Sequence, residues 1–181
     1  YREEKRAALF DFLEKDSHEE GLRRRILAAP PLFVIPQEVL KQILAENGIS
    51  RQECTGILKA HAREQRRIES ILTHSQVIDE LSQVTKAEYE KYPAVLPVAE
   101  CFLEKDILLT YQEYRTCVEA AMAYADAHKN YQFSLIKVKG FHNIQITCRM
   151  EKWCMVSKNK TPSIHFVIHH PKLRYALENM I

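Results

Sequence analysis

The sequence predicts an α+β fold with a helical N-terminal layer, then a small, mainly antiparallel sheet of three to four strands, and a C-terminal helix. Apolar residues recur at helical spacing through residues 1–130, and they alternate with polar residues after Asn130. The chain has 181 residues, of which 46% are hydrophobic and 28% are charged. A chain of this length and composition can bury a core without disulfides or metals. We therefore expect one compact domain, with a helical part at residues 1–130 and a β-rich part with a terminal helix at residues 131–181.

Helix boundaries in the first part follow from capping signals. Residues 2–15 form an amphipathic segment, residues 22–27 a short helix ended by prolines, and residues 36–45 a helix that begins at a proline. Three Ser/Thr-x-x-Glu patterns, at Ser50, Thr85 and Thr110, are capping boxes that open three more helices. Residues 94–109 show no clear period.

The helix after Ser50 has an apolar seam that is interrupted by His61 and Gln65. A polar pair inside such a seam can set the register between two chains, so this pattern indicates a homodimer.

The strands of the second part follow from alternation with a period of two. Residues 131–135, 144–150 and 164–168 alternate apolar and polar side chains, residues 153–157 are expected to form a further strand, and Gly140 is expected in a turn. Pro171 is expected to begin the last helix, with its apolar residues turned inward: Leu173, Ala176, Leu177 and Met180.

The cysteines indicate a reducing, cytoplasmic setting. There are five, an odd number, and they are widely spaced: Cys54, Cys101, Cys117, Cys148 and Cys154. No pair has the two-residue gap of metal or redox motifs, so we expect no disulfide framework. No apolar run approaches the length of a membrane-spanning helix, and no leading signal segment is present.

The net charge of +2 hides an uneven distribution. Residues 1–130 hold 18 Lys and Arg against 22 Asp and Glu, whereas residues 131–181 hold 8 against 2. A basic final third favours an anionic partner, either nucleic acid or a small ligand, although a solvated sheet face is the plainer interpretation. Arg63, Arg66 and Arg67 on one helix flank could also grip phosphates, but such clusters are usually solvated.

Metal and enzyme chemistry are weakly indicated. His165 and His169 would lie about 13 Å apart on one strand face, too far to share an ion, so we expect no metal and no cofactor. Cys154 or Cys148 with His142 could form a nucleophile–base pair, but nothing in the sequence marks either thiol as activated. We therefore expect no catalytic residues and no enzyme.

A ligand site is predicted where aromatic and basic residues gather in the final third. Trp153 offers an aromatic surface, and Lys158, His142 and His165 could supply polar contacts beside it. The same side chains could instead stack and neutralise nucleic acid, in which case binding would weaken steeply with salt.

Four stretches resemble one group of bacterial Xre-type (Cro-type) transcription regulators. They are YREEKR at residues 1–6, FVIP at 33–36, NYQF at 130–133 and WCMVSKNKTPSIHFVIHHPKLR at 153–174. In this group a helix-turn-helix domain precedes a longer regulatory region. The resemblance implies that this chain is the effector-sensing or dimerisation region, and that DNA is bound by a domain before Tyr1.

Together these observations predict a regulatory domain that binds a small effector, forms a homodimer and controls an attached helix-turn-helix domain. A ligand that favours one arrangement of the helical layer would change the dimer geometry, and with it the spacing of DNA half-sites. The alternatives are a stand-alone nucleic-acid-binding domain that uses the basic final third and, as a weaker one, a small cysteine/histidine enzyme.

Overall fold

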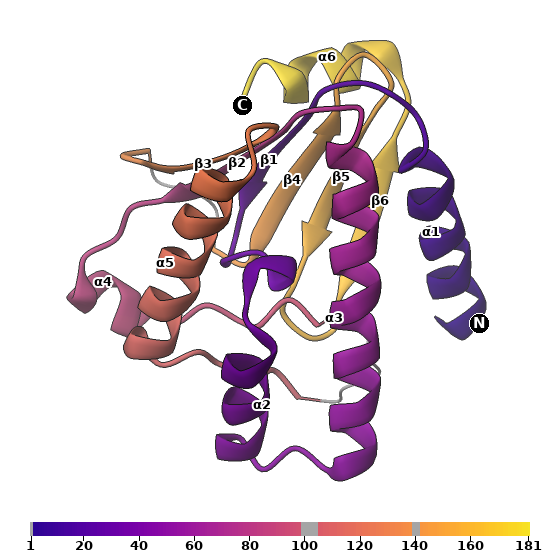
Figure 1. The fold of residues 1–181 in the computed structure, drawn as a ribbon. Helices are drawn as coiled ribbons and strands as arrows, with labels where there is room; N and C mark the ends of the chain where they lie inside the picture. The colour runs from indigo at the N-terminus through magenta and orange to yellow at the C-terminus, as the bar shows by residue number, and fades with distance from the viewer. Residues whose placement is uncertain (1, 99–104, 139–141) are drawn as a thin grey trace.

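A six-stranded mixed sheet runs through the centre of the computed structural model, which describes residues 2–98, 105–138 and 142–181 (Figure 1). The strand order is β3-β2-β1-β4-β5-β6. Three parallel strands make up one half of the sheet, and three strands in an antiparallel meander make up the other. The strands are β1 (Arg23–Leu27), β2 (Val77–Ser82), β3 (Tyr131–Ile136), β4 (Ile144–Arg149), β5 (Trp153–Lys158) and β6 (Ile164–Ile168).

The combination of helices, a sheet and a C-terminal helix is confirmed, but the sheet has six strands and is half parallel, where three to four mainly antiparallel strands were expected. β1 and β2 lie within the first 130 residues, and β1 replaces the short helix expected at residues 22–27. The reason is that their buried face carries ion-paired side chains. Arg23 and Arg25 point to the buried face of β1, and Asp79 lies at the middle of that face in β2. These charges hide the apolar alternation by which strands are recognised.

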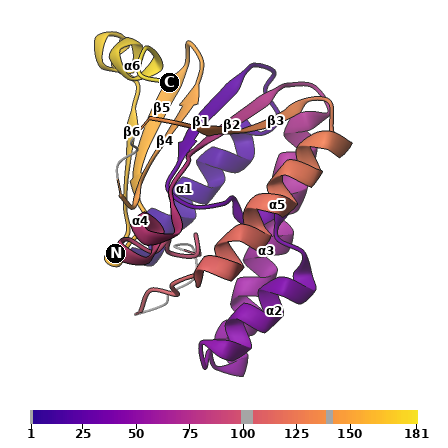
Figure 2. The same cartoon turned by 90° about the vertical axis from the view of Figure 1, so that its left-hand side faces the viewer.

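Most helices cover one face of the sheet (Figure 2). On that side lie α1 (Arg2–Asp16), α3 (Arg51–Leu72) and α5 (Tyr111–Ala127), with α2 (Gln37–Glu46) below them and the short α4 (Lys86–Lys91) at one end. The helix α6 (Pro171–Glu178) lies on the opposite face. All three predicted capping boxes are present, at the starts of α3, α4 and α5.

The main core lies between the sheet and the helices α2, α3 and α5, where a continuous cluster of aliphatic and aromatic side chains is buried. A smaller cluster of Ile146, Cys148 and Cys154 lies under α6. The prediction that α6 turns its apolar residues inward is wrong for Leu173, Ala176 and Met180, which are exposed, and only Leu177 is half-buried. The helix packs mainly on the β4–β5 hairpin, so it has room to bury few side chains.

The polar interruption of the α3 seam is satisfied within the chain. His61 is buried, and its Nε2 lies 2.8 Å from the carbonyl oxygen of Ile35. Gln65 Nε2 donates to the carbonyl oxygen of Phe33 at 3.2 Å. Both side chains therefore tie α3 to the 3-10 turn Leu32–Val34, and this contact explains the pattern without a second chain.

Acid should destabilise the fold through His61. Burial lowers the pKa of His61 below its ordinary value, while the contact with the Ile35 carbonyl acts in the opposite direction. Because the unfolded chain then binds the proton more tightly, stability is full above the unfolded pKa and falls as pH drops through about 6.5. We expect the free energy of unfolding to fall further between about pH 7.5 and about pH 5 in the native chain than in His61→Gln. Equal losses in urea titrations of the two proteins would contradict this.

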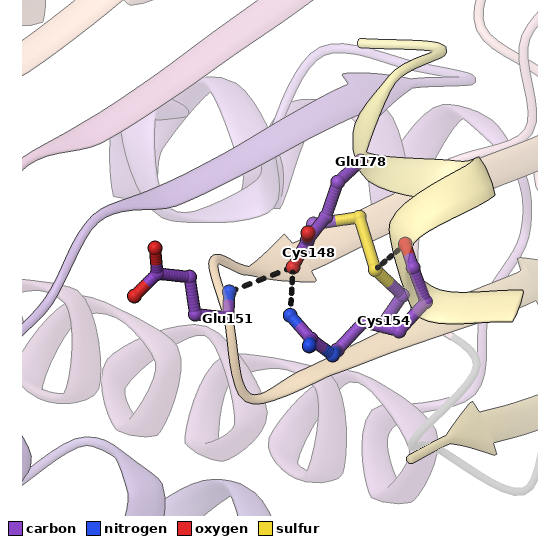
Figure 3. The surroundings of a disulfide bond; sticks show 5 residues. Cys148, Glu151, Cys154 and Glu178 are labelled. Carbon is purple, nitrogen blue, oxygen red and sulfur yellow. Dashed lines mark hydrogen bonds and ion pairs between the residues drawn. A yellow bond between two sulfur atoms is a disulfide. The ribbon is translucent and has the colours of Figure 1, made fainter. Parts of the chain in front are cut away.

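Cys148 and Cys154 form a disulfide, contrary to the expectation from cysteine usage (Figure 3). They face each other directly across β4 and β5, with Cα atoms 4.2 Å apart. Spacing motifs do not reveal this pair, because the register of a hairpin brings the two cysteines together. Cytoplasmic location remains a prediction, but cysteine usage no longer supports it.

The disulfide lies beneath α6. Cys154 Sγ is 3.8 Å from the carbonyl oxygen of Arg174, and the Glu178 carboxylate accepts a hydrogen bond from the backbone of Glu151 (Figure 3). Reduction should therefore loosen the contact between α6 and the hairpin. We expect a reductant to lower the free energy of unfolding by roughly 2 kcal/mol, because the loop that the disulfide closes is short. Urea unfolding with and without dithiothreitol measures this.

The control for reduction is a double substitution, Cys148→Ala with Cys154→Ala, which should be insensitive to dithiothreitol. If the double variant responds to the reductant as the native chain does, the effect does not come from this disulfide. Of the other cysteines, Cys54 and Cys117 are free. Cys101 and Gly140 lie outside the described residues, as does Tyr1.

Within the described part of the chain, no helix has both the length and the apolar character needed to cross a membrane.

Candidate functional site

A cavity of about 150 Å³ lies on the helical side of the sheet, between α1, α3 and the strands β1, β4, β5 and β6. Figure 1 shows α1 and α3 standing side by side over these strands. Most of the apolar part of its wall comes from α1, the 3-10 turn and α3. The apolar lining includes Leu9, Phe10, Leu13, Leu32, Phe33, Ile68 and Ile71, and from β5 Trp153 and Met155.

The helix α1 forms a half-buried wall of the cavity. Leu9, Phe10 and Leu13 line the cavity yet are only half-buried. Phe10 lies under the Arg63 guanidinium, 5.4 Å from ring centroid to Cζ, and Phe12 meets Trp153 edge-on with centroids 5.1 Å apart. A wall held by so few buried contacts can move at lower cost than the core strands.

The sheet supplies a polar part of the wall. Alternation along β4, β5 and β6 turns Gln145, Thr147, Ser157 and His165 toward the helices, and Asn159 follows β5 at the same wall. His165 Nδ1 lies 2.9 Å from Ser157 Oγ, and Gln145 Nε2 donates to Thr147 Oγ1 at 3.4 Å. The cavity thus has an apolar side and a side rich in hydrogen-bonding groups, as small-molecule sites do.

Two arginines share one carboxylate at the end of α1. Asp16 accepts a hydrogen bond from Arg23 Nη2 at 3.3 Å, and Arg149 Nε lies 3.6 Å from its other oxygen. Trp153 Nε1 also donates to Asp16, at 3.0 Å. The Arg149 guanidinium packs against Gly21. Glycine is required there because φ is 138° and because a Cβ would collide with that guanidinium. This cluster fixes the last turn of α1 to β1, β4 and β5.

A second ion pair lies deeper in the sheet. Arg25 donates to both oxygens of Asp79, at 2.6 and 2.5 Å, and Tyr131 donates its hydroxyl to the same carboxylate at 2.7 Å. Asp79 is fully buried, so its charge depends on these partners.

A third ion pair joins Glu64 and Arg67 on α3, at 3.0 and 2.7 Å. Burial would raise the pKa of Glu64, but the Arg67 charge outweighs it and holds that pKa below its ordinary value. For Arg23, burial outweighs the opposite charge of Asp16, so its pKa lies below the ordinary value. Burial lowers its pKa, Asp16 raises it, and the charges of Arg149 and Arg67 lower it again. The positive charges around the cavity are therefore close enough to repel one another.

The structure brings together two of the four residues predicted to bind a ligand. Trp153 and His165 both line the cavity. Lys158 is next to Ser157 on β5 and therefore points to the opposite face of the sheet. His142 lies before β4 and stacks on Tyr92, with ring centroids 4.0 Å apart. Neither Lys158 nor His142 is among the residues that line this cavity.

Sequence reasoning missed the charged residues of the cavity. No sequence pattern marks Arg23 or Asp16, and Arg67 stands out in the sequence only as part of a cluster with Arg63 and Arg66. The run of three arginines in β1 is the signal that could have found the site, since Arg23 and Arg25 fall on one face of a strand.

The arginines of α3 do not form one basic patch. Arg67 pairs with Glu64 and lines the cavity, Arg63 lies over Phe10, and Arg66 is exposed. In the basic final third, Arg149 is buried beside Asp16 and Arg174 pairs with Glu178 at 2.8 Å. Part of the positive surplus is therefore used inside the molecule, which weakens the case for a nucleic-acid surface.

The cysteine–histidine pair considered for catalysis is not assembled. Cys148 and Cys154 are bonded to each other under α6, and His142 stacks on Tyr92. A disulfide sulfur is not a thiolate nucleophile, so the basis for that enzyme hypothesis is removed. Among the side chains that the structure describes, no group of three or more His, Cys, Asp or Glu residues could hold a metal ion.

Comparison with known proteins finds no family model, no curated protein and no solved structure that matches this chain.

Proposed function

We propose that the chain is a small-molecule-sensing domain of a transcription regulator, and that the effector occupies the cavity between α1, α3 and the sheet. The observation that carries the proposal is this cavity of about 150 Å³, with its apolar wall, its polar sheet wall and its buried arginines. A cavity of about that size can hold a benzene-sized molecule. The resemblance to Xre-type regulators adds the output, an attached helix-turn-helix domain.

The helix α1 is the element that would transmit binding. It supplies three apolar residues to the cavity wall, and its last turn is tied to the sheet through Asp16. A ligand that fills the cavity gives Leu9, Phe10 and Leu13 new apolar contacts and so favours the docked position of α1. Binding then shifts a population of helix positions, and an attached domain or a second copy of this chain responds to that shift.

The chain contains its own reporter of ligand binding. Trp153 is the only tryptophan, and it lines the cavity. We expect benzamide or benzoate, each with one ring, to change Trp153 fluorescence in a saturable way and to slow amide exchange in α1. Binding should be stronger than about 10 mM, the affinity that about −0.3 kcal/mol per heavy atom gives a ligand of about nine such atoms.

A matched pair of substitutions locates the probe. Leu13→Phe fills part of the cavity from α1 and should abolish binding. Ala8→Phe places the same ring on the exposed side of the same helix and should leave binding unchanged. If neither probe binds, or if both variants bind as the native chain does, the cavity is not an effector site and the proposal fails.

The regulatory output is tested on the full-length gene product. Its affinity for promoter DNA should change when the bound probe is present, and Leu13→Phe should remove that response. Sedimentation of the same product tests the proposed homodimer. DNA binding that is equal with and without saturating probe would contradict control by this cavity.

A further inference from the structure

We propose that the ligand of this cavity is a small monoanion, a carboxylate carried on a single ring or short chain, whose charged group is held beside Arg23 and Arg67. This inference rests on the proposed function, because it names the chemical class of the effector. Three observations support it: the charge balance of the site, an unused buried donor, and the arrangement of polar and apolar walls.

The charge balance leaves one buried positive charge without a buried carboxylate. Four arginines, Arg23, Arg25, Arg67 and Arg149, lie in or beside the cavity wall. Three largely buried carboxylates face them, of which Asp79 serves Arg25 and Glu64 serves Arg67. Asp16 is the one buried carboxylate beside both Arg23 and Arg149, since Glu19, which lies 3.9 Å from Arg149 Nη2, is 66% exposed. A monoanionic ligand would make the numbers of buried positive and negative charges equal. A dianion would leave one buried negative charge in excess.

The unused donor belongs to Arg23, whose side chain is only 5% exposed. Its Nη1 donates to the Gly21 carbonyl at 2.7 Å, and its Nη2 donates to the Asp16 and Glu19 carbonyls at 2.6 and 2.7 Å. Its Nε is buried and has no hydrogen-bond partner among the described residues. A buried N–H without an acceptor is costly, and a carboxylate oxygen in the cavity is the acceptor that would remove this cost.

The walls determine how such a ligand would lie. Its charged end would be placed against β1 and α3, where Arg23 and Arg67 line the cavity. Its apolar end would contact Leu13 of α1 and the ring of Trp153. The volume of about 150 Å³ limits that end to about one ring or a short acyl chain.

Benzoate and benzamide separate charge from shape, because they differ mainly in the charged group. At constant ionic strength, we expect benzoate to bind the native chain about ten to a hundred times more tightly than benzamide, since a charged hydrogen bond is worth about 1.5–3 kcal/mol. Quenching of Trp153 fluorescence and isothermal calorimetry measure both affinities.

Arg67→Gln and Arg66→Gln form the matched pair of variants, because they lie on the same helix but only Arg67 lines the cavity. Arg67→Gln should lose at least about tenfold in benzoate affinity and retain benzamide binding, which shows that the variant is folded. Arg66→Gln should bind both probes as the native chain does.

Each outcome of this experiment decides something. Equal affinities for benzoate and benzamide overturn the anion inference and leave the small-molecule function standing. Equal losses in the two arginine variants overturn it as well, because the preference would then come from the general charge of the surface. Failure of both probes to bind overturns the anion inference together with the proposed function.

Discussion

Replacing Asp79 by asparagine should lower the free energy of unfolding by about 3–5 kcal/mol, since this is the usual cost of leaving a buried charge without its partner. Asp79 is fully buried and accepts from Arg25 through both carboxylate oxygens. Burial alone would lower the pKa of Arg25, and the Asp79 charge raises that pKa above its ordinary value. The arginine therefore stays charged in Asp79→Asn, in the middle of the sheet, with only a neutral amide beside it.

The same two strands provide the control. Arg24 and Glu80 form the neighbouring pair on the opposite face of β1 and β2, at 3.2 Å, with side chains 30% and 22% exposed. Glu80→Gln should cost less than about 1 kcal/mol, because water compensates a partly exposed charge. Urea unfolding of both variants measures the contrast. Equal costs would mean that Arg25 and Asp79 are not the buried pair described.

A triple substitution separates the charge from the packing. Arg25→Met, Asp79→Leu and Tyr131→Phe together remove all three polar partners and keep an apolar filling. Buried ion pairs replaced by apolar residues are often neutral or stabilising, so the triple variant should recover most of the stability lost in Asp79→Asn. A triple variant as unstable as the single one would show that the geometry of the cluster, and not its charge, stabilises the sheet.

The fold could be predicted where one face of an element is purely apolar. The strands β4 and β6 alternate apolar and polar side chains, and the capping boxes at Ser50, Thr85 and Thr110 place three helix starts. The strands β1 and β2 could not be predicted in this way, because Arg25 and Asp79 occupy their buried face as partners of each other. Two charges that neutralise each other across strands 54 residues apart leave no local signal in either strand.

Only half of the predicted ligand-binding residues lie at the candidate site. Trp153 and His165 could be assigned to it from the sequence, because they are aromatic and basic side chains in the basic final third. Lys158 satisfied the same criterion, yet strand parity places it on the other face. Asp16 and Arg23 belong to the site only through contacts between the end of α1 and the sheet, and those contacts follow from tertiary structure.

Asp16→Asn should release α1 from the sheet and lower the free energy of unfolding by about 3 kcal/mol, because Arg23 and Arg149 then oppose each other without a carboxylate between them. Both guanidinium groups are nearly fully buried, at 5% and 4% exposed. The amide can still accept from Trp153, but it carries no charge. We expect faster amide exchange in α1 and a red shift of Trp153 emission, since water gains access to the cavity.

Asp11→Asn is the matched control, because Asp11 lies on the exposed side of the same helix. It should leave amide exchange in α1 and Trp153 emission unchanged, and the free energy of unfolding should stay within about 0.5 kcal/mol of the native chain. If Asp16→Asn behaves in the same way, α1 is not anchored by its carboxylate, and movement of α1 cannot depend on the charge of the cavity. If only Asp16→Asn frees the helix, Arg23 has two roles. Its positive charge holds α1 through Asp16, and the same charge would bind an anionic effector.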